Sequence, residues 1–167
     1  MLTALGLSAT AAHADDTLAE LEQRLARHGV DAVNAHLLSH GGGAMSAFNR
    51  KTAACELPAV SLAVRLARGR EPHAFGAHGE ALRAASGACA GFVLALSAPS
   101  EIPRYCATLA SWGPAQMARE LRRRIAAIDA DEVLRANPRG QSCKAAYLYE
   151  LHHTRVVVRP MPRASTP

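Results

Sequence analysis

Residues 57–68 read Leu-Pro-Ala-Val-Ser-Leu-Ala-Val-Arg-Leu-Ala-Arg, and Gly69 follows them. Apolar side chains recur here at helical spacing in two neighbouring stripes, which are Val60, Val64, Ala67 and Leu62, Leu66. Gly69 stands where a glycine commonly ends a helix. Two further apolar runs, 75–82 and 89–96, come soon afterwards. The pattern therefore predicts short helices that stack through tight turns.

The composition favours helices throughout the chain. Of its 167 residues, 49% are hydrophobic and only 4% are aromatic, with Ala and Leu dominating the apolar share. Ala and Leu are strong helix formers, whereas the aromatic residues that favour strands are scarce. We therefore predict an all-α fold, either a compact bundle or a short α-solenoid of about six to seven helices stabilised by disulfides. The helical domain is expected over 15–154, followed by a flexible, basic, proline-rich tail over 155–167.

Residues 1–14 have the character of a secretory signal peptide. They are small or apolar up to an A-x-A cleavage pattern at 12–14, which Asp15 and Asp16 follow. The basic segment that usually opens a signal peptide is missing, and an N-terminal helix of the mature fold is the alternative. No other segment reaches the roughly 20 apolar residues that a membrane span needs. We therefore predict a periplasmic or secreted protein without a membrane span.

Four cysteines fit an exported domain: Cys55, Cys89, Cys106 and Cys143. An even number in such a domain indicates two disulfides, and the spacing is too wide for a CxxC zinc or redox site. Three connectivities are possible, of which we favour Cys55–Cys89 with Cys106–Cys143. Each bridge then closes a loop of about 35 residues, and the chain-entropy argument assigns such a loop about 4 kcal/mol of stability.

The formal charge of +5 is compatible with an anionic partner. No aromatic residues are interleaved with the basic ones, and no groove-reading motif accompanies them. The charge is also ordinary for an arginine-rich composition. We therefore predict no nucleic-acid binding, while the oligomeric state stays open.

The clearest amphipathic helix is expected over 114–128. Its apolar stripe contains Met117, Leu121, Ile125 and Ile128. Its arginines are expected in solvent, and these are Arg119, Arg122, Arg123 and Arg124. Three of them, Arg119, Arg122 and Arg123, are candidate contacts to an acidic protein partner, with an exposed Trp112 as a candidate interface anchor. The alternative is a solvated helix face that Glu120 partly neutralises. A turn is expected at 137–140, before a final helix with Tyr149 on its apolar face.

Three segments and one cysteine, taken in chain order, form a pattern. They are Leu62-Ala63-Val64-Arg65-Leu66-Ala67-Arg68-Gly69, Phe92-Val93-Leu94-Ala95-Leu96, Cys106, and Cys143-Lys144-Ala145-Ala146-Tyr147-Leu148. This pattern, over residues 57–151, resembles a group of uncharacterised exported proteins of Proteobacteria. The resemblance implies a helical periplasmic domain with a Cys106–Cys143 bridge, and it brings no catalytic residues. Cys55 and Cys89 depart from the pattern.

A hydrolase is the enzymatic alternative, because parts of the chain match parts of an esterase site. The run 40–43 (His-Gly-Gly-Gly) is similar to an oxyanion loop, and 87–91 (Gly-Ala-Cys-Ala-Gly) is similar to a nucleophile elbow with Cys89 as the nucleophile. Candidate acids and bases follow in the order of that fold, and these are Asp129 or Asp131, then His152 or His153. However, the residues before Cys89 favour a helix where the elbow needs a strand, and a disulfide would remove the thiolate. We therefore expect no catalytic residues.

Histidines give a weaker indication of a metal site. His36 and His40 lie four residues apart on an expected helix, and His152 and His153 are candidate additional ligands. Because no acidic or third ligand is near them in the sequence, we predict no metal and no cofactor. His73 and His78 flank an expected turn and are predicted at the surface.

The sequence thus predicts a domain that binds a protein and has no enzymatic activity. One form of this function is an immunity or inhibitor protein against a cell-wall-targeting effector, an expectation based on class analogy. A Cys- or metal-dependent hydrolase is the first alternative. A module that binds an anionic ligand through the arginines is the second, and its affinity would fall with salt.

Overall fold

The computed structural model describes residues 17–39 and 42–157, with side chains up to Thr154. The predicted signal peptide at 1–14 and the part of the predicted tail at 158–167 lie outside the described residues. Within the described ranges the chain forms nine α-helices and one 3-10 turn, with no strand, which confirms the all-α prediction. Two of these helices, α6 and α8, have four and five residues. The other seven agree with the predicted number.

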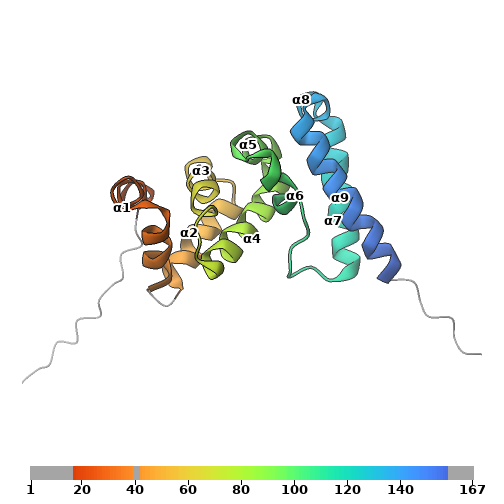
Figure 1. Cartoon of the computed structure of the whole chain (residues 1–167). Coiled ribbons are helices and arrows are strands. Elements are labelled where there is room, and N and C mark those ends of the chain that lie inside the picture. Colours follow the sequence, from red (N-terminus) through yellow and green to blue (C-terminus); the bar gives the residue numbers. More distant parts are fainter. Residues whose placement is uncertain (1–16, 40–41, 158–167) are drawn as a thin grey trace, which may run out of the picture.

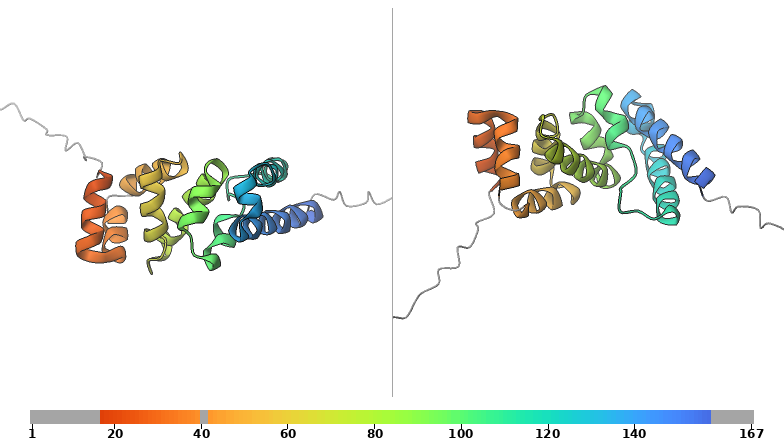
Figure 2. Two further views of the ribbon diagram at one scale, coloured as in Figure 1. Left: turned by 90° about the horizontal axis from the view of Figure 1, so that it is seen from above. Right: turned by 60° about the horizontal axis from the view of Figure 1, so that its bottom comes forward.

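The helices form a stack that runs from α1 at one end to the α7–α9 hairpin at the other (Figure 1). Their bounds are α1 Leu18–Ser39, α2 Gly43–Ala53, α3 Leu57–Leu66, α4 Pro72–Ala88, α5 Ala90–Leu96, the 3-10 turn Pro99–Glu101, α6 Ile102–Tyr105, α7 Pro114–Ala130, α8 Glu132–Ala136 and α9 Pro138–Val157. Seen from above, successive helices lie beside one another along one direction (Figure 2). This arrangement is the α-solenoid form of the prediction.

Helix α3 is the centre of the first half of the stack. It packs against α1, α2, α4 and α5, and its two apolar stripes are buried together. Pro58 lies in its first turn, where a missing N–H costs nothing. The helix ends at Leu66, and Gly69 does not cap it in a left-handed conformation. A Cβ on Gly69 would lie 2.5 Å from Nδ2 of Asn34, so this glycine is needed for the close approach of α1.

Helix α1 contains two helical segments joined at Gly29, whose φ of 79° breaks the regular geometry. Glycine adopts this left-handed conformation without the steric cost that a side chain brings. At its beginning, the Glu20 carboxylate accepts a hydrogen bond from the Thr17 N–H at 2.7 Å, and Thr17 Oγ1 accepts from the Glu20 N–H at 3.3 Å. These two bonds form a capping box, which fixes the start of the stack.

One predicted turn is wrong. Residues 138–140 form the start of α9, because Pro138 suits a first helical position and the side chain of the preceding Asn137 accepts the Arg139 N–H at 2.9 Å. The inward face of this helix also differs from the predicted one. Tyr147 is buried in it, whereas Tyr149, predicted on the apolar face, is 64% exposed.

The apolar core has two parts. The first lies among α1 to α5 and includes Tyr105 of α6. The second lies among α5 to α9 and contains the Cys106–Cys143 disulfide. The other disulfide, Cys55–Cys89, joins the α2–α3 corner to the α4–α5 corner. This is the connectivity that we favoured from the sequence. Each bridge joins two segments that are far apart in the chain, with sequence separations of 34 and 37 residues.

Candidate functional site: the arginines of α7 and the adjoining pocket

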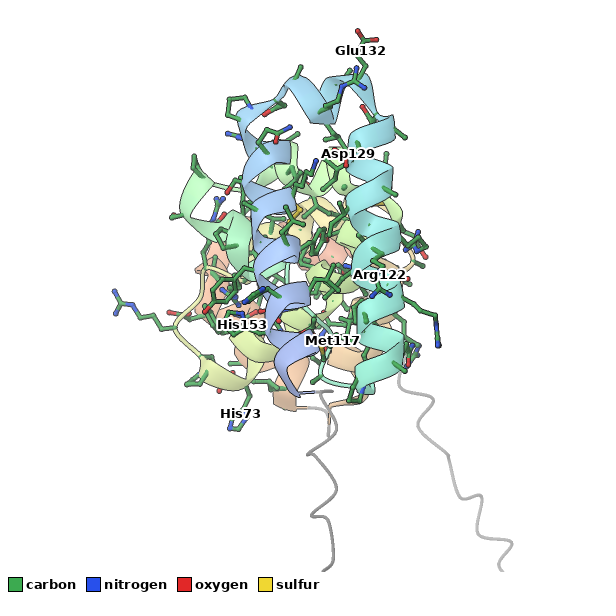
Figure 3. All side chains as sticks on the ribbon, turned by 90° about the vertical axis from the view of Figure 1, so that its right-hand side faces the viewer. His73, Met117, Arg122, Asp129, Glu132 and His153 are labelled. Carbon is green, nitrogen blue, oxygen red and sulfur yellow. A yellow bond between two sulfur atoms is a disulfide. The ribbon has the colours of Figure 1, made fainter. Side chains whose placement is uncertain are left out.

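Helix α7 lies beside α9 at one end of the molecule, and α8 joins them (Figure 3). Leu121 and Ile128 of α7 are fully buried against this neighbour, which orients the rest of the helix. Arg119 and Arg122 consequently point to solvent, and neither has an ion pair or hydrogen bond with another described side chain. They are the freely exposed part of the predicted arginine cluster.

Arg124 does not lie in solvent as predicted. Its residue exposure is 4%, because position 124 falls within the buried stripe of α7 between Leu121 and Ile128. Its Nη1 donates to the Arg83 carbonyl at 2.7 Å and to Tyr147 Oη at 3.2 Å. Arg124 thereby connects α7 to both α4 and α9.

Glu120 links Arg124 to Arg123. Arg124 Nε donates to the Glu120 carboxylate at 3.1 Å, and Arg123 Nε donates to it at 2.8 Å. The hydrogen bond from Arg123 is the main cause that lowers the pKa of Glu120 to about 2, with Arg124 contributing in the same direction. The carboxylate is therefore ionised at neutral pH. This triad carries two positive charges and one negative charge.

Trp112 is half-buried and is not the fully exposed anchor that the sequence suggested. The Arg124 guanidinium carbon lies 4.9 Å from the Trp112 ring centroid, a cation–π distance. The guanidinium also packs closely on Gly87 of α4, where a Cβ would come within 2.5 Å of Arg124 Nη2. Arg123 Nη2 donates to the Gly87 carbonyl at 3.3 Å. Arg123 and Arg124 thus both contact the Gly87 end of α4, and Trp112 lies against Arg124.

A pocket of about 220 Å³ opens beside this corner, and we call it the Arg124 pocket. Its walls come from the α4–α5 junction, from α7 and from α9, and include Gly87, Gly91, Arg124, Ala127, Asp131 and Tyr147. Among the described residues, Nη2 of Arg124 has no hydrogen-bond acceptor. Tyr147 Oη accepts a hydrogen bond from Arg124, which leaves its own proton available. Burial is the main cause that raises the pKa of Tyr147, so that proton stays bound at neutral pH.

A second pocket, of about 230 Å³, lies at the other end of the α7–α9 pair. It is mainly apolar and is lined by Pro114, Met117, Glu150, His153 and Thr154. Figure 3 shows Met117 and His153 at this end, away from Asp129 and Glu132 near α8. Thr154 Oγ1 donates to the Met117 sulfur at 3.0 Å, which ties the two helices together here.

Within the part of the chain that the structure describes, the residues that suggested a hydrolase do not form a site. Cys89 is bonded to Cys55, so its sulfur is not a thiolate, and helix α4 precedes it in place of a strand. His40 and Gly41 of the suggested oxyanion loop lie outside the described residues. Gly42 lies at the α1–α2 corner, whereas His152 and His153 are on α9 at the opposite end of the stack (Figure 1).

The histidines are similarly separated. His36 of α1 and the α9 pair lie at opposite ends, and no group of three or more potential metal ligands occurs in the described part of the chain. His73 points away from the molecule, as predicted (Figure 3). His78 is fully buried, so its predicted surface position is wrong. Within the described residues, no helix combines the length and apolar character that crossing a bilayer requires.

Comparisons with protein families, curated proteins and solved structures found no match. The resemblance to exported proteobacterial proteins therefore stays a prediction. The function must be argued from the residues described above.

Two polar residues that the sequence placed at the surface are buried, although each lies within a periodic apolar pattern. His78 falls between Ala74 and Leu82 at four-residue spacing, and both neighbours are fully buried. Arg124 falls in the same way between Leu121 and Ile128. A polar residue inside an apolar stripe was the available indication of burial, and burial of such a residue requires hydrogen-bond partners.

Proposed function

We propose that this chain is a non-enzymatic protein-binding domain of the periplasm or the extracellular space. The surface proposed to bind is the exposed face of α7, with Arg119 and Arg122 as its principal charges. The observation that supports this proposal is that both guanidiniums are in solvent without an ion-pair partner among the described residues. They lie three residues apart on one helix, which places them as neighbours on its surface. An acidic protein surface is the complementary partner.

The cysteines support an exported location. All four are joined in two disulfides, and disulfides persist in oxidising compartments. Two bridges crossing the stack fit a domain that keeps a rigid surface outside the cytoplasm. The bonding of Cys89 also removes the nucleophile on which the thiol-hydrolase alternative depended.

The immunity or inhibitor role is the specific form of this proposal. It is supported by analogy with a class of proteins. A small helical domain with disulfides and an exposed basic face suits the recognition of an acidic region on another exported protein. The partner sought first is therefore a cell-wall-targeting effector encoded beside this chain.

The test is co-purification of the disulfide-bonded protein with the products of adjacent genes. The variant Arg119→Glu/Arg122→Glu reverses both charges of the proposed face. The control Arg27→Glu/Arg50→Glu makes the same charge change at exposed arginines of α1 and α2. We expect wild type and control to retain the same adjacent gene product, and the α7 variant to lose it. Retention by the wild type should also weaken between 0.05 and 0.5 M salt, because exposed charges are screened. Equal retention by all three proteins, or none by the wild type, would contradict the proposal.

A further inference from the structure

We propose that the Arg124 pocket is a binding site for a carboxylate group, which Nη2 of Arg124 and the hydroxyl of Tyr147 receive together. This inference concerns a different surface from the exposed arginines and does not depend on the protein partner proposed above.

The first observation is the unused hydrogen-bonding capacity of the pocket wall. Arg124 is nine-tenths buried or more, yet only its Nε and Nη1 reach acceptors in the described protein. Nη2 adds two N–H groups, and Tyr147 Oη adds one O–H. Nη2 is not among the fully buried polar atoms that lack a partner, so it reaches solvent-accessible space, where a ligand that accepts hydrogen bonds can use it. A carboxylate has two oxygens and matches a guanidinium and a hydroxyl well.

The second observation is the charge beside the pocket. Two guanidiniums, of Arg123 and Arg124, share the single carboxylate of Glu120. The triad therefore carries one net positive charge, and of its two guanidiniums Arg124 is buried whereas the Arg123 side chain is 56% exposed. Asp131 also lines the pocket. It lies seven residues along from Arg124, which corresponds to about 10 Å on a helix, and its Oδ1 accepts the Leu134 N–H at 3.0 Å. The end of the pocket near Arg124 therefore stays positive.

The third observation is that the guanidinium is held in place before any ligand arrives. Its plane packs between the Trp112 ring and the Gly87 backbone, and the Arg83 carbonyl fixes Nη1. A fixed cation loses little conformational freedom on binding. The volume of about 220 Å³ accommodates a carboxylic acid of a few carbon atoms. Such a carboxylate belongs either to a small free acid or to an Asp or Glu side chain of a protein.

Trp112 provides the readout, because it is the single tryptophan of the chain and contacts Arg124. The disulfide-bonded protein is titrated with sodium acetate, with sodium succinate and with the blocked peptide acetyl-Ala-Glu-Ala-amide, at constant ionic strength set with sodium chloride. We expect a saturable change in Trp112 fluorescence with the carboxylates and none with chloride. Tighter binding of acetate or succinate identifies a free acid as the ligand, and tighter binding of the peptide identifies a side chain.

Three variants locate the effect. Ala127→Phe fills the pocket from α7, whereas Ala126→Phe places the same ring on the exposed face next to it. We expect the first to abolish the titration and the second to leave it unchanged. Tyr147→Phe keeps the ring and removes the hydroxyl, and it should weaken the affinity about ten- to a hundredfold, the range for one hydrogen bond to a charged group. Thermal unfolding confirms that each variant is folded.

The proposal would be overturned if chloride reproduced the fluorescence change, if no carboxylate produced a saturable change, or if Ala127→Phe titrated like the wild type. These results would leave the partner-binding proposal intact, because that rests on Arg119 and Arg122. Conversely, loss of the protein partner in the charge-reversal variant would not alter the acetate titration.

Discussion

Nε2 of His78 lies 3.1 Å from Oδ1 of Asn34, and this contact joins α4 to α1 in the interior of the stack. Both residues are fully buried. Asn34 Nδ2 donates to the Leu66 carbonyl at 3.0 Å, which directs its oxygen toward the imidazole and makes Nε2 the donor. Nδ1 lies 2.9 Å from the Asn49 side chain, whose amide group can rotate to present an N–H. Three helices are thus connected through one neutral imidazole.

The buried imidazole predicts that stability falls in mild acid. Burial, with a smaller contribution from Arg104, lowers the pKa of His78 to about 4. The unfolded state takes up the proton near pH 6.5 and the folded state does not, so the stabilisation is complete above pH 6.5 and is lost as the pH falls toward 4. We expect the free energy of unfolding to decrease by about 2 kcal/mol between pH 7.5 and pH 5. Urea unfolding at both pH values measures it.

The matched histidine variants assign this effect. His78→Gln should be less stable at pH 7.5 and should lose the difference between the two pH values. His73→Gln, at an exposed position of the same helix, should retain the full difference. An unchanged pH dependence in His78→Gln would show that another group is responsible.

The glycines of two helices predict opposite effects of the same substitution. Gly140 is buried in α9, and a Cβ there would overlap the backbone carbonyl oxygen of Leu134. Because backbone atoms cannot move aside without displacing α8, Gly140→Ala should destabilise the protein by about 3 kcal/mol or more. Gly76 of α4 has nothing near its Cβ position, so Gly76→Ala should stabilise by about 0.5–1 kcal/mol. Thermal unfolding compares them, and equal effects would refute the close packing of α8 on α9.

The sequence predicted the parts of the fold that depend on neighbouring residues. The apolar stripes of 57–68 identified α3, and the composition identified the all-α class, because both are local properties of a chain. The turn expected at 137–140 was wrong for a local reason as well. Asn-Pro is compatible with a turn and with a helix start, and the sequence pattern alone does not decide between them; in the structure the helix begins at Pro138.

The Arg124 pocket was not predictable in the same way. Its α4–α5 wall is separated from its α7 wall by more than thirty residues in the chain, and the two meet only because the arginines of α7 reach the α4–α5 corner. The runs 87–91 and 119–124 were each recognised, but as unrelated features. The sequence does not show that these two runs lie close together, because their contact depends on which residue of α7 turns inward. That choice follows from the packing of Leu121 and Ile128 against α9.

The two disulfides should differ in their contributions to stability although their loops are similar. Their sequence separations are 34 and 37 residues, so the chain-entropy argument assigns each about 4 kcal/mol. Cys106 and Cys143 are fully buried, whereas Cys55 and Cys89 are partly exposed. Cys106→Ser/Cys143→Ser therefore also buries two hydroxyl groups, which costs about 1–3 kcal/mol more than the same change at Cys55 and Cys89. Urea unfolding of the two double variants tests this order, and the reverse order would contradict it.

The carboxylate of Glu120 predicts a second, more acidic pH dependence. Its pKa of about 2 results first from the hydrogen bond with Arg123, and the folded state therefore holds its charge down to low pH. The unfolded carboxyl binds its proton near pH 4.5, so the stabilisation is complete above pH 4.5 and is lost as the pH falls toward 2. Glu120→Gln removes the charge at every pH. It should lower the free energy of unfolding by about 2–3 kcal/mol at pH 7.

The difference between wild type and Glu120→Gln is the quantity to follow, because His78 titrates equally in both proteins and cancels from it. We expect this difference, measured by urea unfolding, to shrink by more than half between pH 7 and pH 3. Glu132→Gln, at an exposed position of α8, is the control and should differ little from wild type at either pH. If the Glu120→Gln difference stayed constant with pH, the interaction would depend on shape and hydrogen bonding and not on charge. The two guanidiniums of Arg123 and Arg124 would then need no anion, and the charge beside the Arg124 pocket would not favour a carboxylate.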